Sequence, residues 1–199
     1  MTTSTAPLTI WPPVAPEAPP ADRTVHVLSA AATPTCNSTL TGTAATTCAA
    51  YTTYSRYLAM GGSALMVAAI SADTALTKAG QREAAQDVWA ACGAVYTVVQ
   101  GMDQAFLQAI ADLDAGQPFA PVDPPSNLPD FPSAPSGNDA VTTVIDSIWT
   151  LVADAVQLVL AKVADGPLKI ALEGSLAQGQ KAFEYLAPIL DKYFGTPSS

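Results

Sequence analysis

The chain has 199 residues, of which 49% are apolar and 13% are charged, and 17 acidic residues against 8 basic ones leave a net charge of −9. The apolar fraction excludes a wholly disordered chain, and the length suffices for a single core. The acidic balance argues against a nucleic-acid partner, because neutralising phosphates requires clustered Lys and Arg.

The first 42 residues are predicted to form an extended arm rich in proline and threonine. Six prolines fall between Pro7 and Pro20, around Trp11, and proline lacks an amide donor and pushes the preceding residue out of helical space. The arm is either a disordered linker or is held by packing or by a partner. Residues 1–6 carry no basic side chain and no sufficiently long apolar run follows, so we expect no signal peptide. The compartment is unknown, with the cytoplasm or an assembled particle as the default expectation.

Residues 43–115 are predicted to form a first helical hairpin. Its first helix contains Gly61 and Gly62, which either break the helix or allow a neighbouring helix to approach closely. The second helix begins near Gln81 and ends at Gly116, where glycine suits a left-handed cap. The apolar residues at helical spacing are Tyr51, Tyr54, Leu58, Leu65, Ala69, Ala72 and Leu76 in the first helix, and Val88, Cys92, Val95, Val99, Met102, Phe106, Ile110 and Leu113 in the second.

Residues 116–138 are predicted to form a proline-rich connector. Seven prolines fall between Pro118 and Pro135, and an extended chain of this composition reaches about 70 Å at roughly 3.1 Å per residue. A helix of about 30 residues is only about 45 Å long. The connector is therefore long enough to return the chain to the far end of a helical bundle, and a disordered linker is the alternative.

Residues 139–195 are predicted to form a second hairpin. Asp165, Gly166 and Pro167 stop its first helix, and Pro188 should kink the second helix or end its regular part. Two helices joined by so short a turn are expected to be antiparallel neighbours. The stripe residues are Val141, Ile145, Ile148, Val152, Ala155 and Val159 in the first helix, and Leu168, Leu172, Leu176, Phe183, Leu186, Leu190 and Phe194 in the second.

Together these elements predict an all-α fold, a four-helix bundle of two antiparallel helical hairpins joined by a long Pro-rich crossover, with an extended Pro-rich N-terminal arm. Two separate hairpins are the competing layout, although each alone would bury its stripe poorly. Alternation at period two is confined to short pieces such as residues 24–28, so strands are not expected. The longest apolar run, residues 57–72, is shorter than the roughly 20 residues of a membrane span. We interpret it as a buried helix, with a single span as the alternative.

The residue types offer little for catalysis, and we expect neither an enzyme nor a cofactor. His26 is the only histidine and lies in the arm, so a metal site or a nucleophilic arrangement on the helices has no imidazole to use. The three cysteines match no zinc spacing. Cys92 lies on an apolar stripe and is interpreted as a core residue. Cys36 and Cys48 form either a disulfide that staples the arm to the bundle or two free thiols.

Aromatic residues supply the candidate interface. They fall in two clusters, near the start of the first helix and near the end of the last, with Trp11 in the arm. Aromatic side chains with a polar tip are common at protein interfaces. The candidate interface residues are Trp11, Tyr51, Tyr54, Tyr57, Tyr185, Tyr193 and Phe194. Ordinary core packing is the alternative.

The scarcity of charge is the best functional clue in the sequence. Weakly charged helices in a soluble monomer would leave apolar patches exposed, and such patches usually mark contacts. We therefore predict a non-catalytic structural or assembly protein that packs through weakly charged helical faces and the arm, against itself or another protein subunit. The alternative is a lipid- or membrane-surface protein, although interfacial helices typically carry Lys and Arg and these helices are acidic. A small-ligand binder with a pocket between helices is a third hypothesis.

Overall fold

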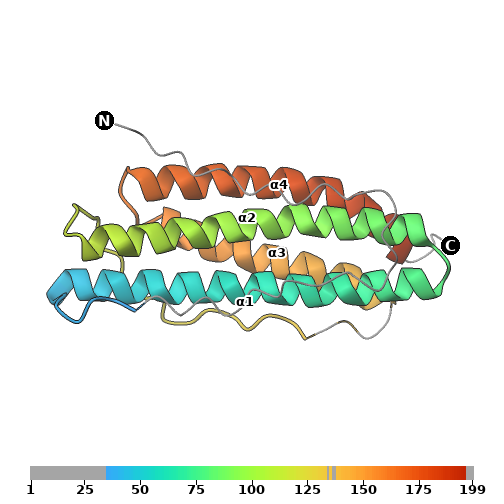
Figure 1. Ribbon diagram of the computed structural model, residues 1–199, viewed down its shortest axis with the longest axis horizontal. Helices are drawn as coiled ribbons and strands as arrows, with labels where there is room; N and C mark the ends of the chain where they lie inside the picture. The colour runs from blue at the N-terminus through green and yellow to red at the C-terminus, as the bar shows by residue number, and fades with distance from the viewer. Residues whose placement is uncertain (1–34, 134, 136–137, 196–199) are drawn as a thin grey trace.

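The computed structural model describes residues 35–133, 135 and 138–195. Within these residues the chain forms four helices and no strand: α1 (Gly42–Lys78), α2 (Arg82–Asp114), α3 (Asn138–Leu160) and α4 (Pro167–Phe194) (Figure 1). The prediction of an all-helical fold is therefore confirmed. Trp11, His26 and the rest of residues 1–34 lie outside the described residues, so what the sequence predicts for them stays a prediction.

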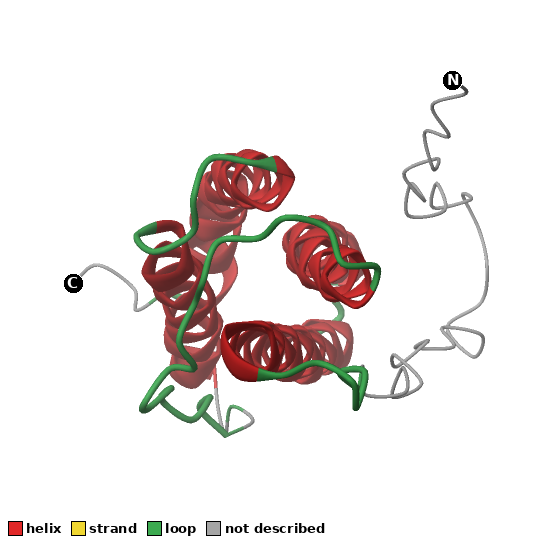
Figure 2. Ribbon diagram, turned by 90° about the vertical axis from the view of Figure 1, so that its left-hand side faces the viewer, coloured by secondary structure: helices red, strands yellow, loops and turns green. Residues whose placement is uncertain are grey.

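The four helices surround one core. α1 packs against α2 and α3, and α4 packs against the same two helices. Viewed end-on, α1 and α4 lie on opposite sides of the bundle, with α2 and α3 between them (Figure 2). The buried apolar residues form a single cluster to which all four helices contribute.

The predicted apolar stripes form this core. All stripe residues of α1, α2 and α3 are buried, as the spacing of the apolar residues predicts. In α4 the stripe residues are buried to different extents. Leu172, Leu186 and Leu190 are buried, whereas Leu168 and Leu176 are half-buried. α4 therefore lies on the core with a narrower apolar contact than the other three helices.

Glycines end the first two helices. Gly80 and Gly116 have φ angles of 77° and 72°, a left-handed conformation that a side chain would strain. The backbone N–H of Gln81 donates to the carbonyl oxygen of Leu76 across 2.9 Å, and the same pattern of hydrogen bonds closes α2. The predicted cap at Gly116 is confirmed, and α2 begins one residue after the predicted Gln81.

The turn between α3 and α4 is followed by two prolines of α4, one at its start and one inside it. α3 ends at Leu160, five residues before the predicted stop at Asp165, and residues 161–166 form the turn to α4. α4 begins at Pro167, where the missing N–H leaves no helical hydrogen bond unmade. Pro188 lies inside α4, which continues to Phe194. The alternative in which Pro188 ends the helix is therefore wrong.

α1 is continuous through its glycine pair because both glycines make room for neighbouring side chains. A Cβ on Gly61 would lie 2.8 Å from Cζ of Phe131 and 2.8 Å from Cγ2 of Val152. A Cβ on Gly62 would lie 3.2 Å from Cε2 of Tyr96. Of the two interpretations of this pair, close approach is confirmed and a helix break is wrong.

The connector between α2 and α3 runs along α1 (Figure 1). The backbone N–H of Val122 donates to Oγ1 of Thr47 across 3.2 Å, and the hydroxyl of Tyr57 donates to the carbonyl oxygen of Pro129 across 2.8 Å. The ring centroid of Phe131 lies 4.5 Å from that of Tyr57. These contacts hold the described part of the connector against the helix.

Candidate contact surface

Four of the seven candidate interface residues are buried and offer no surface for a partner. Tyr51 and Tyr54 are 3% and 2% exposed, and their ring centroids lie 5.8 and 5.7 Å from that of Phe106. Burial raises the pKa of both phenols. Tyr57 and Phe194 are also buried. In the folded chain these four side chains face the core and the connector, as the core-packing alternative expects, and a role at an interface stays a prediction for them.

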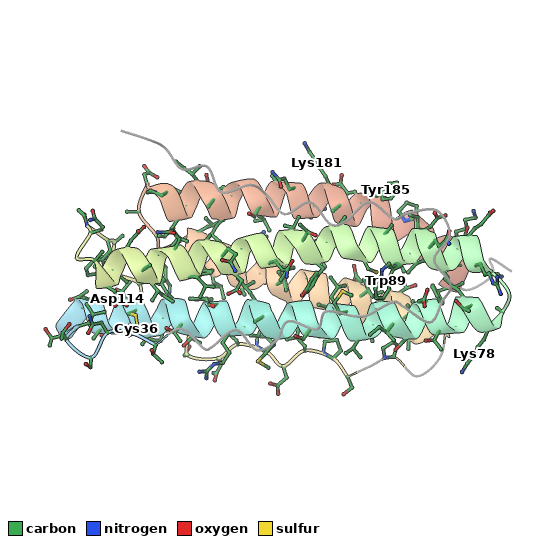
Figure 3. The ribbon with its side chains drawn as sticks, in the orientation of Figure 1. Cys36, Lys78, Trp89, Asp114, Lys181 and Tyr185 are labelled. Atoms are coloured by element: carbon green, nitrogen blue, oxygen red, sulfur yellow. A yellow bond between two sulfur atoms is a disulfide. The ribbon has the colours of Figure 1, made fainter. Side chains whose placement is uncertain are left out.

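The other three candidates do not come together. Tyr185 is 66% exposed on the outward side of α4 (Figure 3). Tyr193 is half-buried, and Nζ of Lys192 lies 4.7 Å from the centroid of its ring. Trp11 lies outside the described residues. The aromatic residues therefore do not form a joint contact surface in the described part of the chain.

A disulfide joins Cys36 to Cys48, with a Cα–Cα distance of 5.9 Å. It ties the segment before α1 to the second turn of that helix. The backbone N–H of Asn37 also donates to Oδ1 of Asp114 across 3.1 Å, which connects this segment to the end of α2. Cys36 and Asp114 lie at the same end of the bundle in Figure 3. Cys92 is buried with a free thiol, and burial raises its pKa to about 12, so the unreactive thiol form persists at neutral pH.

A groove of about 920 Å³ opens at this end of the bundle. Its apolar lining includes Tyr51, Leu113, Pro118, Phe119, Val163 and Leu168. Three of its polar side chains pair along their own helix or turn: Gln108 donates to Asp112 across 2.9 Å, and Asp165 pairs with Lys169 at 2.7 Å. The groove therefore has the size of a ligand site, with three of its polar side chains already paired.

One carboxylate lies at the interface of α1 and α2. Oγ of Ser55 donates to Oδ1 of Asp103 across 2.5 Å. Burial raises the pKa of Asp103, while the hydrogen bond from Ser55 opposes that rise. A hydroxyl and a carboxylate without a base to activate the hydroxyl do not make a nucleophilic site. We therefore treat the pair as part of the packing of the two helices.

The outward side of α1 carries a long row of exposed residues with little charge. Their spacing alternates between three and four, so they form one line along the helix. This α1 outer line consists of Thr46, Ala49, Thr53, Arg56, Met60, Ser63, Val67, Ile70, Thr74 and Thr77. Arg56 is its one charged residue. Met60, Val67 and Ile70 are among the most exposed large apolar side chains of the described chain, at 52%, 47% and 38%.

Hydroxyl groups of the α1 outer line are bonded inside the helix. Three of them donate to the carbonyl oxygen four residues earlier: Thr46 to Gly42 at 3.2 Å, Thr53 to Ala49 at 2.8 Å and Ser63 to Ala59 at 2.9 Å. A hydroxyl that has such an acceptor loses less when water is removed from it. These three polar positions of the line can therefore be covered by another surface at low cost.

Two helices are long and apolar enough to cross a membrane, by length and composition alone. They are α1 and the Ala140–Leu160 part of α3. The core helix of a soluble protein meets the same criterion, and both helices contribute buried residues to the core. Length and composition alone therefore do not distinguish these two helices from core helices of a soluble protein.

Sequence reasoning missed the α1 outer line because it followed the apolar stripe that forms the core. The signal was present on the other side of the same helix. Between Arg56 and Lys78 the helix has one charged residue, Asp73, whereas exposed faces of surface helices usually carry charges at every turn.

The described residues contain no group of three or more His, Cys, Asp or Glu side chains that could hold a metal ion. No family model, no curated protein and no solved structure matches this chain. Function is therefore inferred from the surface of the molecule.

Proposed function

We propose that this chain is a non-catalytic structural protein that assembles with itself or with another protein subunit through a weakly charged helical face. The observation that carries the proposal is the α1 outer line, with one charged residue in ten exposed positions. A solvent-exposed helix face gains solubility from charged side chains, and a face without them suits contact with another surface.

The energetics of covering this line favour contact. Burying an unpaired charge or hydroxyl is costly, but the line has one charge, and three of its five hydroxyls have acceptors inside the helix. Met60, Val67 and Ile70 would each gain about 25 cal/mol for every Å² of apolar surface removed from water. Their exposed apolar area is thus a source of association free energy, and the hydrogen bonds within the helix lower the desolvation cost at three of the hydroxyl positions.

The finer architecture belongs to the same proposal. Two antiparallel hairpins, α1–α2 and α3–α4, are joined by the Pro-rich crossover into one bundle. The turn of residues 79–81 and the turn of residues 161–166 support this layout, as do the contacts of α1 with α3 and of α2 with α4. A contact of the proline-rich N-terminal segment with a neighbouring subunit is part of the same proposal, which the proline content of that segment supports.

The disulfide favours an oxidising compartment over the cytoplasmic default. Disulfides persist where thiols are not continuously reduced, and Cys36 and Cys48 are bonded to each other. Thiol counting in denaturant without reductant tests this. One reactive thiol, from Cys92, agrees with the disulfide, and three thiols contradict it.

A lipid surface is the second candidate, favoured by the length and apolar composition of α1 and of Ala140–Leu160. The charge opposes it, because an acidic chain of net charge −9 is repelled by anionic lipid surfaces. Flotation with neutral and anionic vesicles separates the two candidates. Co-migration with vesicles favours the lipid function, and a lipid-free assembly favours the structural one.

Light scattering coupled to size-exclusion chromatography tests the proposed function most directly. The chain has a mass of 20.4 kDa, and we expect a larger mass that rises with concentration. A constant monomer mass contradicts assembly of the chain with itself, and no vesicle binding contradicts the lipid function.

A further inference from the structure

The segment just before α1 contains an acceptor motif for N-linked glycosylation. In this motif an asparagine is followed by any residue except proline and then by serine or threonine, as in Asn37-Ser38-Thr39. The other two asparagines, Asn127 and Asn138, have no hydroxyl residue two positions later. Such a triplet also occurs by chance, so its place in the fold decides whether a sugar can be attached there.

The motif lies in an exposed turn. The backbone N–H of Leu40 donates to the carbonyl oxygen of Asn37 across 3.0 Å, which closes a turn over residues 37–40. All three motif residues are exposed, and so are residues 41–43 around the start of α1. A bulky, hydrated oligosaccharide on Asn37 would therefore displace no packed side chain of the described chain.

The nitrogen that carries the sugar in such linkages is available. The backbone N–H of Asn37 donates to Oδ1 of Asp114 across 3.1 Å, and Oδ1 of Asn37 accepts from the backbone N–H of Thr39 across 3.1 Å. These bonds orient the asparagine and occupy the oxygen of its carboxamide. Among the described residues Nδ2 of Asn37 has no hydrogen-bond partner, so a sugar on this atom breaks no contact there.

The disulfide is the second observation that favours a glycosylated chain. Cys36, directly before the motif, is bonded to Cys48. Disulfides persist in secreted proteins and in the compartments that export them, and N-linked glycosylation likewise belongs to secreted proteins. The inference therefore rests on the oxidising compartment proposed above. It is independent of the proposed assembly, because Asn37 is not part of the α1 outer line.

We propose that Asn37 is a site of N-linked glycosylation. The substrate is an oligosaccharide whose anomeric carbon carries a diphosphate leaving group, and a transferase of the compartment catalyses the step. Nδ2 forms a bond to the anomeric carbon, the bond from that carbon to the diphosphate oxygen breaks, and the diphosphate leaves with the bonding electrons. Nδ2 gives one of its two protons to a base of the transferase.

Mass spectrometry of the full chain, recovered from the cells that produce it, tests the site. We expect a mass that falls when a peptide N-glycosidase removes the sugar, with Asn37 converted to aspartate by that release. Asn127 is also exposed but lacks the motif, so it should remain unmodified. A mass that the enzyme leaves unchanged, with Asn37 intact, overturns the proposal.

Two substitutions of Thr39 form a matched pair, because Thr39 bonds to Asn37 through its backbone and not its side chain. Thr39→Ala removes the hydroxyl that the motif requires and should abolish the modification, whereas Thr39→Ser keeps a hydroxyl and should retain it. Once the sugar has been removed enzymatically, both variants should melt at the temperature of the unchanged chain. Equal occupancy of Asn37 in the two variants overturns the assignment to this motif.

Pro129→Thr is the positive control, since it gives Asn127 the same motif at another exposed position. The carbonyl oxygen of Pro129 that accepts from Tyr57 is kept in this variant. Modification of Asn127 without modification of Asn37 would show that the turn before α1 is not recognised. Modification of neither would show that the chain does not meet the transferase. Both results overturn the proposal.

Two further measurements separate this proposal from the proposed function. One reactive thiol without a sugar leaves the disulfide standing and overturns the glycosylation site. Light scattering of Thr39→Ala measures assembly of a chain that carries no sugar. A constant monomer mass for this variant and for the unchanged chain contradicts self-assembly, while a sugar found on Asn37 of the unchanged chain still supports the site.

Discussion

α1 and α4 lie on opposite sides of the bundle. They differ in how many of their residues are buried and in how many charges their outward sides carry. Sixteen residues of α1 are buried against five of α4, although both helices touch the same two neighbours. The outward side of α4 has the charged residues Glu173, Lys181 and Glu184, as expected of a helix in water, and Lys181 points away from the bundle in Figure 3. The outward side of α1 has one charge in ten positions. A helix that is extensively buried on its inner side and carries one charge on its outer side is suited to contacts on both sides.

The two helices also differ in how they are held. α1 packs with many small residues along its length, whereas α4 depends on a few large ones. Trp149 of α3 stacks on Phe183 of α4 with ring centroids 5.9 Å apart, and the indole fits against Gly179. A substitution on the α4 side should therefore act by changing one large contact. A substitution on the α1 side should change only one of many small contacts along the helix.

Gly179→Ala should have the largest effect. The added Cβ would overlap Cη2 of Trp149 and lie 2.7 Å from Cζ3 of the same ring, which is rigid and buried. We expect a loss of about 3 kcal/mol in the free energy of unfolding, measured by urea denaturation. Gly174→Ala is the matched control five residues earlier in the same helix, because a Cβ there meets nothing within 4 Å. It should be neutral or gain up to about 1 kcal/mol, and equal effects at the two glycines would contradict the packing described.

Removing the disulfide should have the next largest effect, and on the α1 side. Closing a loop of this length contributes up to about 3 kcal/mol in the chain-entropy account. Because the segment before α1 lies at the surface and can open locally, we expect about 2 kcal/mol for Cys36→Ser, measured by thermal unfolding. Adding a reductant to the unchanged chain should reproduce the shift in melting temperature, and adding it to Cys36→Ser should not shift it further.

Gly61→Ala should cost less than Gly179→Ala, about 1–2 kcal/mol. The added Cβ meets the ends of two side chains, Phe131 and Val152, at 2.8 Å each, and the connector that carries Phe131 can move outward. Double-mutant analysis checks this, because Gly61→Ala should be less costly when Phe131→Ala is also present. Equal costs in both backgrounds would mean that Phe131 does not occupy the space at Gly61.

Asp103→Asn should have the smallest effect, and one that depends on pH. Burial raises the pKa of Asp103 in the folded state, so its contribution to stability is present below the unfolded pKa of about 4 and is lost as the pH rises through the folded value. The asparagine variant keeps an acceptor for Ser55 and should melt at a slightly higher temperature at pH 7, with no difference near pH 3. Asp146→Asn, at an exposed position of α3, controls for the change in net charge.

Helix positions and core stripes were predictable because they depend on local periodicity. The stripe from Val88 to Leu113 repeats at helical spacing over the whole of α2, and all its residues are buried. The glycine cap at Gly116 depends on backbone conformation that glycine alone adopts readily. These features depend on residues that are close together in the sequence, so they can be predicted without knowing where the other helices lie.

Contacts between distant residues were not predictable in the same way. Gly179 and Trp149 meet only because α3 and α4 have a particular rotation about their axes, and nothing in the spacing of either helix specifies it. Tyr51 and Tyr54 were assigned to an interface because a tyrosine ring suits a core and a surface equally. Their burial depends on the position of Phe106 on the facing helix.

The disulfide has a mechanical consequence. A pull on the chain ahead of Cys36 is transmitted through the sulfur–sulfur bond to Cys48, which is buried in the second turn of α1. The loop between the two cysteines carries none of this load. Tension from the N-terminal side therefore enters the bundle within its longest helix, where many contacts share it, and the first turn of that helix cannot be peeled away residue by residue.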